Sequence, residues 1–309
     1  MPIWGVDSSS PAHLPANGTR GASLYEYVCR FLSRNRQRFN AKEAPQFWGR
    51  YLTQSRPTYM LSQDEKNFLH SHGCRIVLIY NDTCWDQHHD IDCKRKVGER
   101  TIRYALTGYD NGTQSAENAC QLAASLDAPN GTRIYADLEG WFVDADWIDA
   151  WCTEVPDKSR RLGRQYTPGI YGRILVGADL ATARRHFRRD PWNVSIEQTI
   201  SEQERRDRLL SRGFLTLGEG HRSDTSRQPS LESTAAPAPP TRPPIHIWSN
   251  MPRYRSGCNE IPDSFEGYSF QGSFSNTVLW QYGMACSNLS RLVDMDLATQ
   301  EGFDEMWRV

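Results

Sequence analysis

Residues 75–81 read Arg-Ile-Val-Leu-Ile-Tyr-Asn, and this stretch decides the fold class. Its apolar side chains follow one another without the polar–apolar alternation of a strand that has one solvated face. Such a run is typical of a strand in a parallel sheet that is covered on both faces. Residues 62–72, just before it, have the pattern of a helix, with a capping box at Ser62 and Glu65 and a stop at Gly73. The sequence therefore predicts a helix followed by a buried parallel strand.

Similar helix-like and strand-like segments alternate along the chain in both directions. Helical spacing of apolar residues covers 24–32, 115–126 and 146–152. Strands that alternate with helices predict right-handed βαβ units and a parallel sheet. Eight strands favour closure into a (β/α)8 TIM-type barrel. We expect these strands at residues 3–7, 47–52, 75–81, 132–138, 167–172, 245–249, 277–282 and 292–295.

An open, doubly wound sheet is the alternative arrangement of the same segments. It is disfavoured because no predicted strand is followed by a glycine-rich phosphate loop. The length of 309 residues suits one barrel domain over residues 1–309, since such barrels take about 250 residues. We expect no cofactor.

Two segments depart from the regular alternation. Residues 82–113 form a polar excursion after the third strand and should rise over the active mouth of the barrel. Residues 197–244 form a polar and proline-rich insertion, and we expect its second part, 223–244, to be disordered because it has almost no apolar side chains. The excursion lacks the spaced third partner of a recognisable metal site, so we expect no metal at its short cluster of His88, His89, Asp90 and Asp92.

The bulk charge and hydropathy exclude two classes of partner. A net charge of -1 and a pI of about 6.7 give no reason to expect a nucleic acid. Mean hydropathy is -0.67, and no apolar run approaches the roughly 18 residues that a membrane span needs. We expect a monomer.

Cysteines and glycosylation sequons give a hint about the compartment. The chain has eight cysteines, and none forms a Cys-x-x-Cys pair, although Cys84 and Cys93 are placed to close the excursion with a disulfide. Six Asn-x-Ser/Thr sequons begin at Asn17, Asn81, Asn111, Asn130, Asn193 and Asn288. About two are expected by chance, so we expect a secreted or cell-envelope protein. Three sequons read Asn-Gly-Thr, which is also ordinary turn chemistry. The first five residues show no signal peptide, and we expect Asn81, at a strand end near the presumed site, to be unmodified.

The sharpest chemical feature is Ile-Tyr-Ala-Asp-Leu-Glu at residues 134–139. Strand side chains alternate, so Asp137 and Glu139 should face the lumen and Leu138 the helix layer. Two acids about 6–7 Å apart along a strand repel each other, so one tends to keep its proton while the other ionises. That division supplies the acid and base of glycoside hydrolysis. A strand end with two solvated acids, or acids bonded to arginine, is the alternative.

Six short motifs, in order from residue 3 to residue 296, resemble the family-25 glycoside hydrolases, the lysozyme-type muramidases. The similarity is closer to the glycoside-hydrolase-like barrels of uncharacterised function beside that family, through the Gly-x-Asp start, the Leu126 to Thr132 approach and the Asp-x-Glu strand. The six motifs are Gly-Val-Asp-Ser-Ser at 5–9, Tyr-Ala-Asp-Leu-Glu at 135–139, Gly-Ile-Tyr at 169–171, Ile-His-Ile-Trp-Ser at 245–249, Leu-Trp-Gln-Tyr at 279–282 and Val-Asp-Met-Asp at 293–296.

The resemblance implies roles for the acids. Glu139 would be the general acid, and Asp137 the assisting carboxylate or, in a retaining variant, the nucleophile. Asp7 and Asp294 would orient water and substrate. Asp296 stands where the family usually has Asn.

Aromatic side chains near strand ends complete the candidate site. Their flat faces suit carbohydrate rings, although core packing is an equal alternative for each one singly. Gln281 is a candidate hydrogen-bonding partner of a sugar. The expected substrate-binding set is Tyr80, Trp85, Trp141, Tyr171, Trp248, Trp280, Gln281 and Tyr282.

Two functions remain in competition. The first is a glycoside hydrolase that cleaves O-glycosidic bonds of a polysaccharide, with peptidoglycan or another amino-sugar polymer as the expected class. The second is a barrel that binds glycan without cleaving it, since a fold does not fix a function. A transglycosidase or lyase that uses the same acids is a third and weaker hypothesis.

Overall fold

The computed structural model describes most of the chain outside the excursion and the insertion. The described residues are 3–36, 44–82, 94–97, 100–103, 108–138, 145–172, 245–250, 261–265 and 277–308. Three predicted site residues, Trp85, Glu139 and Trp141, lie outside them, as do the insertion at 197–244 and the cluster around His88.

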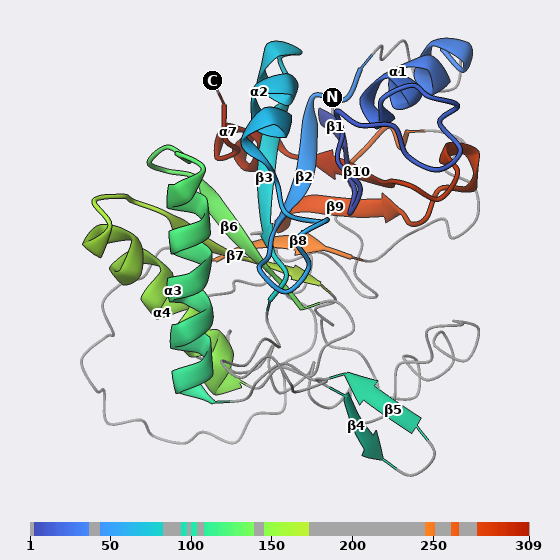
Figure 1. Cartoon of the computed structure of the whole chain (residues 1–309). Coiled ribbons are helices and arrows are strands. Elements are labelled where there is room, and N and C mark those ends of the chain that lie inside the picture. The colour runs from blue at the N-terminus through green and yellow to red at the C-terminus, as the bar shows by residue number, and fades with distance from the viewer. Residues whose placement is uncertain are drawn as a thin grey trace, which may run out of the picture.

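Eight strands close into a barrel, as predicted (Figure 1). The strand order around the barrel is β1-β10-β9-β8-β7-β6-β3-β2. Observed bounds agree closely with the predicted ones, except at the last strand. The strands are β1 (Ile3–Asp7), β2 (Phe47–Leu52), β3 (Arg75–Tyr80), β6 (Arg133–Asp137), β7 (Thr167–Gly172), β8 (His246–Ser249), β9 (Thr277–Gly283) and β10 (Asp294–Ala298).

The expectation of an all-parallel barrel is wrong at β10. This strand runs antiparallel to both of its neighbours, β1 and β9, while every other neighbouring pair in the barrel is parallel. The reason is the short connection between Gly283 and Asp294, which holds only the 3-10 turn η2 (Ser287–Leu289). A parallel crossover needs about a dozen residues or more, so the chain turns back beside β9.

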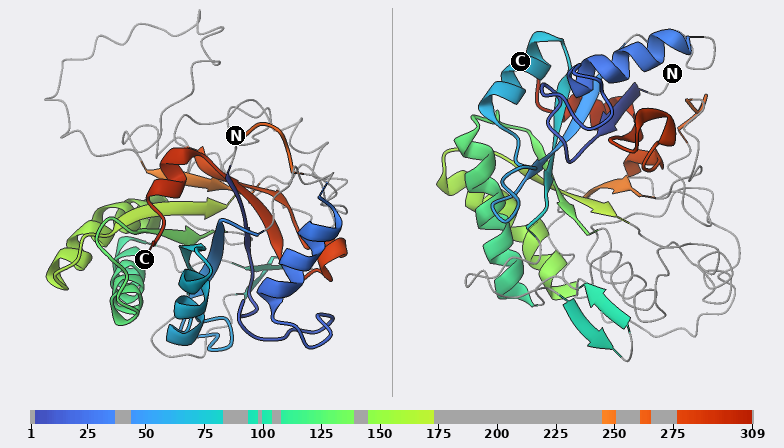
Figure 2. Two further views of the ribbon diagram at one scale, coloured as in Figure 1. Left: turned by 90° about the horizontal axis from the view of Figure 1, so that it is seen from above. Right: turned by 45° about the vertical axis from the view of Figure 1, so that its right-hand side comes forward.

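Helices cover the outside of the barrel (Figures 1 and 2). Helices α3 (Tyr109–Ser125) and α4 (Ala145–Arg161) lie side by side, and α4 packs on β7. On another side, α1 (Leu24–Arg34) packs near η2 and α2 (Gln63–Ser71) packs against β3. None of the helices in the described part of the chain is long and apolar enough to cross a membrane.

The core has two parts because strand side chains alternate. An outer cluster fills the layer between barrel and helices and includes Trp4, Tyr80 and Trp280. An inner cluster fills the lumen and includes Ile79, Tyr135 and Trp248. Every barrel strand therefore has one face in each cluster, which explains the continuous apolar runs in the sequence.

Polar contacts close the N-terminal end of the barrel against α7 (Gln300–Asp304) and the residues after it. The Arg133 guanidinium binds Glu305 with Nε and Nη2, both at 2.7 Å, and His246 Nδ1 lies 2.6 Å from the same carboxylate. Burial alone would raise the pKa of Glu305, but hydrogen bonds from His246 and Arg133 hold it at about 2. These contacts close the N-terminal end of the barrel. The candidate functional site therefore lies at the C-terminal end.

The described cysteines do not form a complete disulfide framework. Cys29, Cys74, Cys120 and Cys152 are free thiols, whereas Cys286 is disulfide-bonded. The suggested pairing of Cys84 with Cys93 lies outside the described residues. The excursion contributes a separate two-stranded sheet of β4 (Lys94–Val97) and β5 (Arg100–Arg103).

Candidate active site at the C-terminal mouth of the barrel

Two predicted acids, Asp7 and Asp294, meet at the seam between β1 and β10. They are direct register partners, because the start of the antiparallel β10 lies beside the end of β1. Gln281, on β9, donates from Nε2 to Asp7 Oδ2 at 3.1 Å and to Asp294 Oδ2 at 3.0 Å. A side-chain amide nitrogen carries two hydrogens, so one group serves both carboxylates. The backbone N–H of Ala285 also donates to Asp294 Oδ1.

Asp296 extends this cluster into the lumen. It lies two residues along β10 on the same face as Asp294 and is fully buried. Its Oδ1 accepts a hydrogen bond of 3.0 Å from Trp248 Nε1, while its Oδ2 meets no hydrogen-bond donor in the described part of the chain. The Asp296 carboxyl is also in hydrogen-bonding contact with that of Asp7. Two carboxyl groups can make such a contact only when one of them carries a proton.

Asp7 and Asp296 thus share one proton. Burial raises the pKa of Asp296 well above its usual range, and the charge of Asp294 adds to the rise; the hydrogen bonds with Asp7 and Trp248 oppose it without cancelling it. The cluster therefore combines Asp296, whose pKa is raised, with Asp7 and Asp294, which accept hydrogen bonds from Gln281.

Asp137 lies across the mouth from this cluster, because β6 and β10 stand four places apart in the order of eight strands. As predicted, Asp137 and Leu138 point to opposite sides, and Leu138 belongs to the outer cluster. Asn81 donates from Nδ2 to Asp137 Oδ2 and accepts at Oδ1 from Arg56 Nη1 at 3.1 Å. The Nδ2 atom that a glycan would modify is thus engaged in the site, which agrees with the expectation that Asn81 is unmodified.

The loop that carries Arg56 is held by Asp82, the residue after Asn81. The Asp82 carboxylate accepts hydrogen bonds of 2.5 Å from the hydroxyls of Thr53 and Ser55 and a further one from the backbone N–H of Gln54. Asn81, Asp82 and Arg56 are not among the predicted site residues. Their position directly after strands β2 and β3 was the available signal.

Two of the predicted aromatics do line the lumen, Tyr171 and Trp248. Their ring centroids are 4.8 Å apart, and Tyr135 meets Trp248 edge-on at 5.7 Å. Gly49 makes room for this packing, since a Cβ there would lie 2.6 Å from the Asp7 Cβ and 2.7 Å from the Trp248 ring. These rings form the floor of the mouth, and they contact the acids directly because Trp248 donates a hydrogen bond to Asp296.

Tyr80, Trp280 and Tyr282 are corrections to the predicted site. All three are fully buried and belong to the outer cluster, because they stand on strand positions that alternate with the inward ones. Tyr80 stacks on Trp151 of α4 at 5.6 Å, and the Tyr282 hydroxyl accepts from Trp4 Nε1 at 2.8 Å. They pack the layer between barrel and helices and do not reach the mouth.

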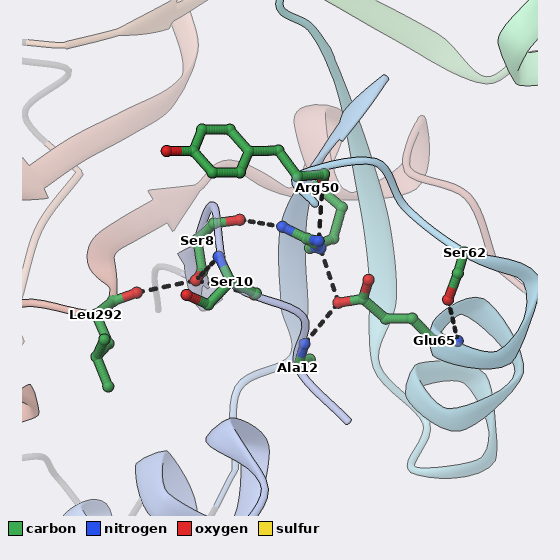
Figure 3. Close-up of polar contacts among 8 residues, drawn as sticks. Ser8, Ser10, Ala12, Arg50, Ser62, Glu65 and Leu292 are labelled. Carbon is green, nitrogen blue, oxygen red and sulfur yellow. Dashed lines mark hydrogen bonds and ion pairs between the residues drawn. The ribbon is translucent and has the colours of Figure 1, made fainter. Parts of the chain in front are cut away.

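A buried ion pair outside the lumen fixes the segment that follows Asp7 (Figure 3). Arg50 Nε lies 2.7 Å from Glu65 Oε1, with both side chains fully buried. Arg50 also donates to the Ser8 carbonyl, and Glu65 accepts from the Ala12 N–H at 2.6 Å. Ser62 caps the Glu65 N–H as predicted, but the Glu65 carboxylate completes this network rather than the capping box.

Ser8 links that network to the strand that carries the other acids. Its Oγ donates to the Leu292 carbonyl at 2.9 Å, two residues before Asp294 (Figure 3). The segments after Asp7 and before Asp294 are therefore tied together outside the lumen. The described residues contain no group of three or more His, Cys, Asp or Glu side chains arranged to hold a metal ion.

The chain is similar to several known proteins. The model of the Rv2525c-like, glycoside hydrolase-like domain matches residues 21–209. An uncharacterised B. stearothermophilus protein of known structure is 22% identical with a TM-score of 0.53, covering 99% of this chain and 100% of that one. The Mycobacterium tuberculosis Tat-secreted protein Rv2525c, in complex with L-tartrate, is 11% identical with a TM-score of 0.43, covering 99% and 98%. No curated protein matches the sequence. The match supports a glycoside-hydrolase-like domain and leaves the resemblance to family 25 without support.

Proposed function

The chain belongs to the Rv2525c-like, glycoside hydrolase-like domain family, and we propose that it is a glycoside hydrolase that cleaves O-glycosidic bonds of a polysaccharide. One observation carries the proposal: the C-terminal mouth holds carboxyl groups in different protonation environments. Buried Asp296 has a raised pKa, and its neighbours Asp7 and Asp294 accept hydrogen bonds from Gln281. Glycoside hydrolysis needs such a division between acid and base.

The proposed roles follow the positions of the acids. Glu139, two residues beyond Asp137 on the sequence, is the proposed general acid, and Asp137 the assisting carboxylate or nucleophile. Asp7 and Asp294 orient water and substrate, and Gln281, Tyr171 and Trp248 shape the floor of the mouth. The resemblance implies peptidoglycan or another amino-sugar polymer as substrate. Trp85 and Trp141 stay in the proposal as sugar-stacking residues.

The test is a reducing-end assay on a panel of polysaccharides. Glu139→Gln and Asp137→Asn should each abolish product release while the melting temperature stays close to that of the wild type. Glu26→Gln, which changes an exposed carboxylate on α1, is the matched control and should keep full activity. Full activity in Glu139→Gln would remove this residue from the mechanism.

A second candidate function is glycan binding without cleavage. The observation that favours it is that the acids already accept hydrogen bonds from the protein. Gln281 donates to Asp7 and Asp294, and Asn81 donates to Asp137. Carboxylates stabilised in this way are weaker bases. A binding module would show affinity in equilibrium titration and no reducing ends after prolonged incubation with the same polymers.

Export to the cell envelope or beyond remains part of the proposal. Its support is the excess of sequons over the number expected by chance. Fractionation of the source cells, followed by detection of the native protein, tests the location. Recovery only from the cytosol would exclude it. A monomer is expected, and sedimentation of the purified chain checks that expectation.

A further inference from the structure

Asn250, directly after β8, and Gln281, on the neighbouring strand β9, both carry side-chain amides at the C-terminal end of the barrel. In the parallel ladder of β8 and β9, Trp248 pairs with Leu279 and Ser249 with Trp280, so the next step places Asn250 beside Gln281. The Asn250 N–H extends the ladder to β7 by bonding the Gly172 carbonyl at 3.1 Å. Trp248 and Leu279 both face the lumen, and side chains alternate, so both amides belong to the lumen face.

Both amides are fully buried, yet three of their polar atoms lack partners. Asn250 Nδ2, Asn250 Oδ1 and Gln281 Oε1 make no hydrogen bond within the described part of the chain. Buried polar side-chain atoms are rarely left unsatisfied in proteins, because the loss of water is then uncompensated. The orientation of the Gln281 amide is fixed, since its nitrogen must face the carboxylates of Asp7 and Asp294.

We propose that Asn250 and Gln281 form a subsite for two adjacent hydroxyl groups of a sugar. The three free atoms are one donor and two acceptors. A vicinal diol satisfies all of them: its two O–H groups donate to Asn250 Oδ1 and Gln281 Oε1, and one of its oxygens accepts from Asn250 Nδ2. An acetamido group beside a hydroxyl also supplies two donors and an acceptor, but it is larger than a hydroxyl group, and both amides are fully buried.

The charge of the neighbouring groups excludes acidic sugars. Gln281 is bonded directly to Asp7 and Asp294, so a carboxylate or phosphate bound beside it would meet two negative groups at short range. The subsite is therefore neutral. The inference rests on the proposed function and narrows its substrate to hydroxyl-bearing sugars, in contrast to the amino sugars that the resemblance implies.

The test compares two oligosaccharides of the same β-1,4 linkage by equilibrium titration with the full chain. Cellohexaose has adjacent hydroxyls at carbons 2 and 3 of each internal unit, whereas chitohexaose has an acetamido group at carbon 2. We expect cellohexaose to bind at least about tenfold more tightly, which corresponds to one or two hydrogen bonds. Asn250→Leu and Asn250→Asp should each lower the affinity for cellohexaose by at least about tenfold.

Asn67→Leu, on the exposed side of α2, is the matched control and should bind like the wild type. Asn250→Leu removes unpaired polar atoms from a buried position, so it should fold, and its melting temperature verifies this. The inference is overturned if neither sugar binds, if chitohexaose binds as tightly as cellohexaose, or if both Asn250 variants keep wild-type affinity because an internal water fills the site. Binding without turnover would refute the hydrolase and leave the subsite standing.

Discussion

Asp7 and Asp294 are direct partners in the ladder between β1 and β10, and the amide nitrogen of Gln281 donates to both carboxylates. Two acids from opposite ends of the sequence thus act as one unit. Their spacing is set by a neutral group on a third strand rather than by a cation. We call these two hydrogen bonds the Gln281 bridge, and the properties of the mouth should depend on it.

Removal of the bridge should destabilise the protein. Gln281→Leu deletes the donor and leaves two carboxylates facing each other, which should cost about 1–3 kcal/mol of unfolding free energy. Chemical denaturation measures the change. Gln300→Leu is the matched control, because Gln300 Nε2 also donates to a carboxylate, Asp304, at 2.9 Å but on the surface. An equal effect of the two substitutions would show that the bridge has no special role.

Asp296 should make the protein less stable as the pH rises. Its pKa in the folded state is raised, so between the unfolded value near 3.9 and the folded value the folded chain binds more protons, and stability falls with pH. Asp296→Asn resembles the protonated carboxyl and removes this loss. The variant should gain on the wild type by up to about 1.4 kcal/mol per pH unit across that window. Urea denaturation from pH 3 to 9 measures the difference, and parallel curves would show that Asp296 is ionised.

The buried Arg50–Glu65 pair should be costly to break from one side. Glu65→Gln leaves the Arg50 charge without its partner, and we expect a loss of about 3–5 kcal/mol in denaturation experiments. Arg50→Met combined with Glu65→Leu should recover a large part of that loss, since no charge is then buried. Arg30→Met, which breaks an exposed pair with Glu26, should cost no more than about 1 kcal/mol. A small effect of Glu65→Gln would mean that water reaches Arg50.

Glu305 should control the acid limb of the stability profile. Its pKa is held at about 2, so its contribution is complete above the unfolded value near 4.3 and is lost as the pH falls toward 2. Glu305→Gln should lower stability at neutral pH and flatten the decline between pH 4 and 2. Melting temperatures over that range check this, with exposed Glu26→Gln as the control that keeps the wild-type slope.

Most of the barrel could be predicted because each strand is covered on both faces. Predicted residues 47–52 and 167–172 coincide with β2 and β7. The direction of β10 was missed, although the short connection after Gly283 contains enough information to exclude a parallel crossover. The wrong direction still placed Asp294 at the correct mouth, since the start of an antiparallel strand and the end of its neighbour coincide.

The predicted site was wrong at Trp280 and Tyr282 because side chains alternate along a strand and these two point away from the lumen. The rule that placed Asp137 inward and Leu138 outward also places Gln281 inward and Trp280 outward, so both could not bind a sugar. The Asn81–Asp137 contact depends on the order of strands around the barrel, which periodicity does not supply. The raised pKa of Asp296 depends on complete burial, which no sequence pattern shows.

The antiparallel return of β10 makes the acid cluster depend on the last strand of the chain. The strand pairs with β1 across almost the whole sequence, and synthesis runs from β1 to β10. A chain interrupted before residue 294 would lack two of the carboxyls and leave β1 and β9 as open edges, which are sites of aggregation. Closure of the barrel and completion of the acid cluster therefore depend on the same strand.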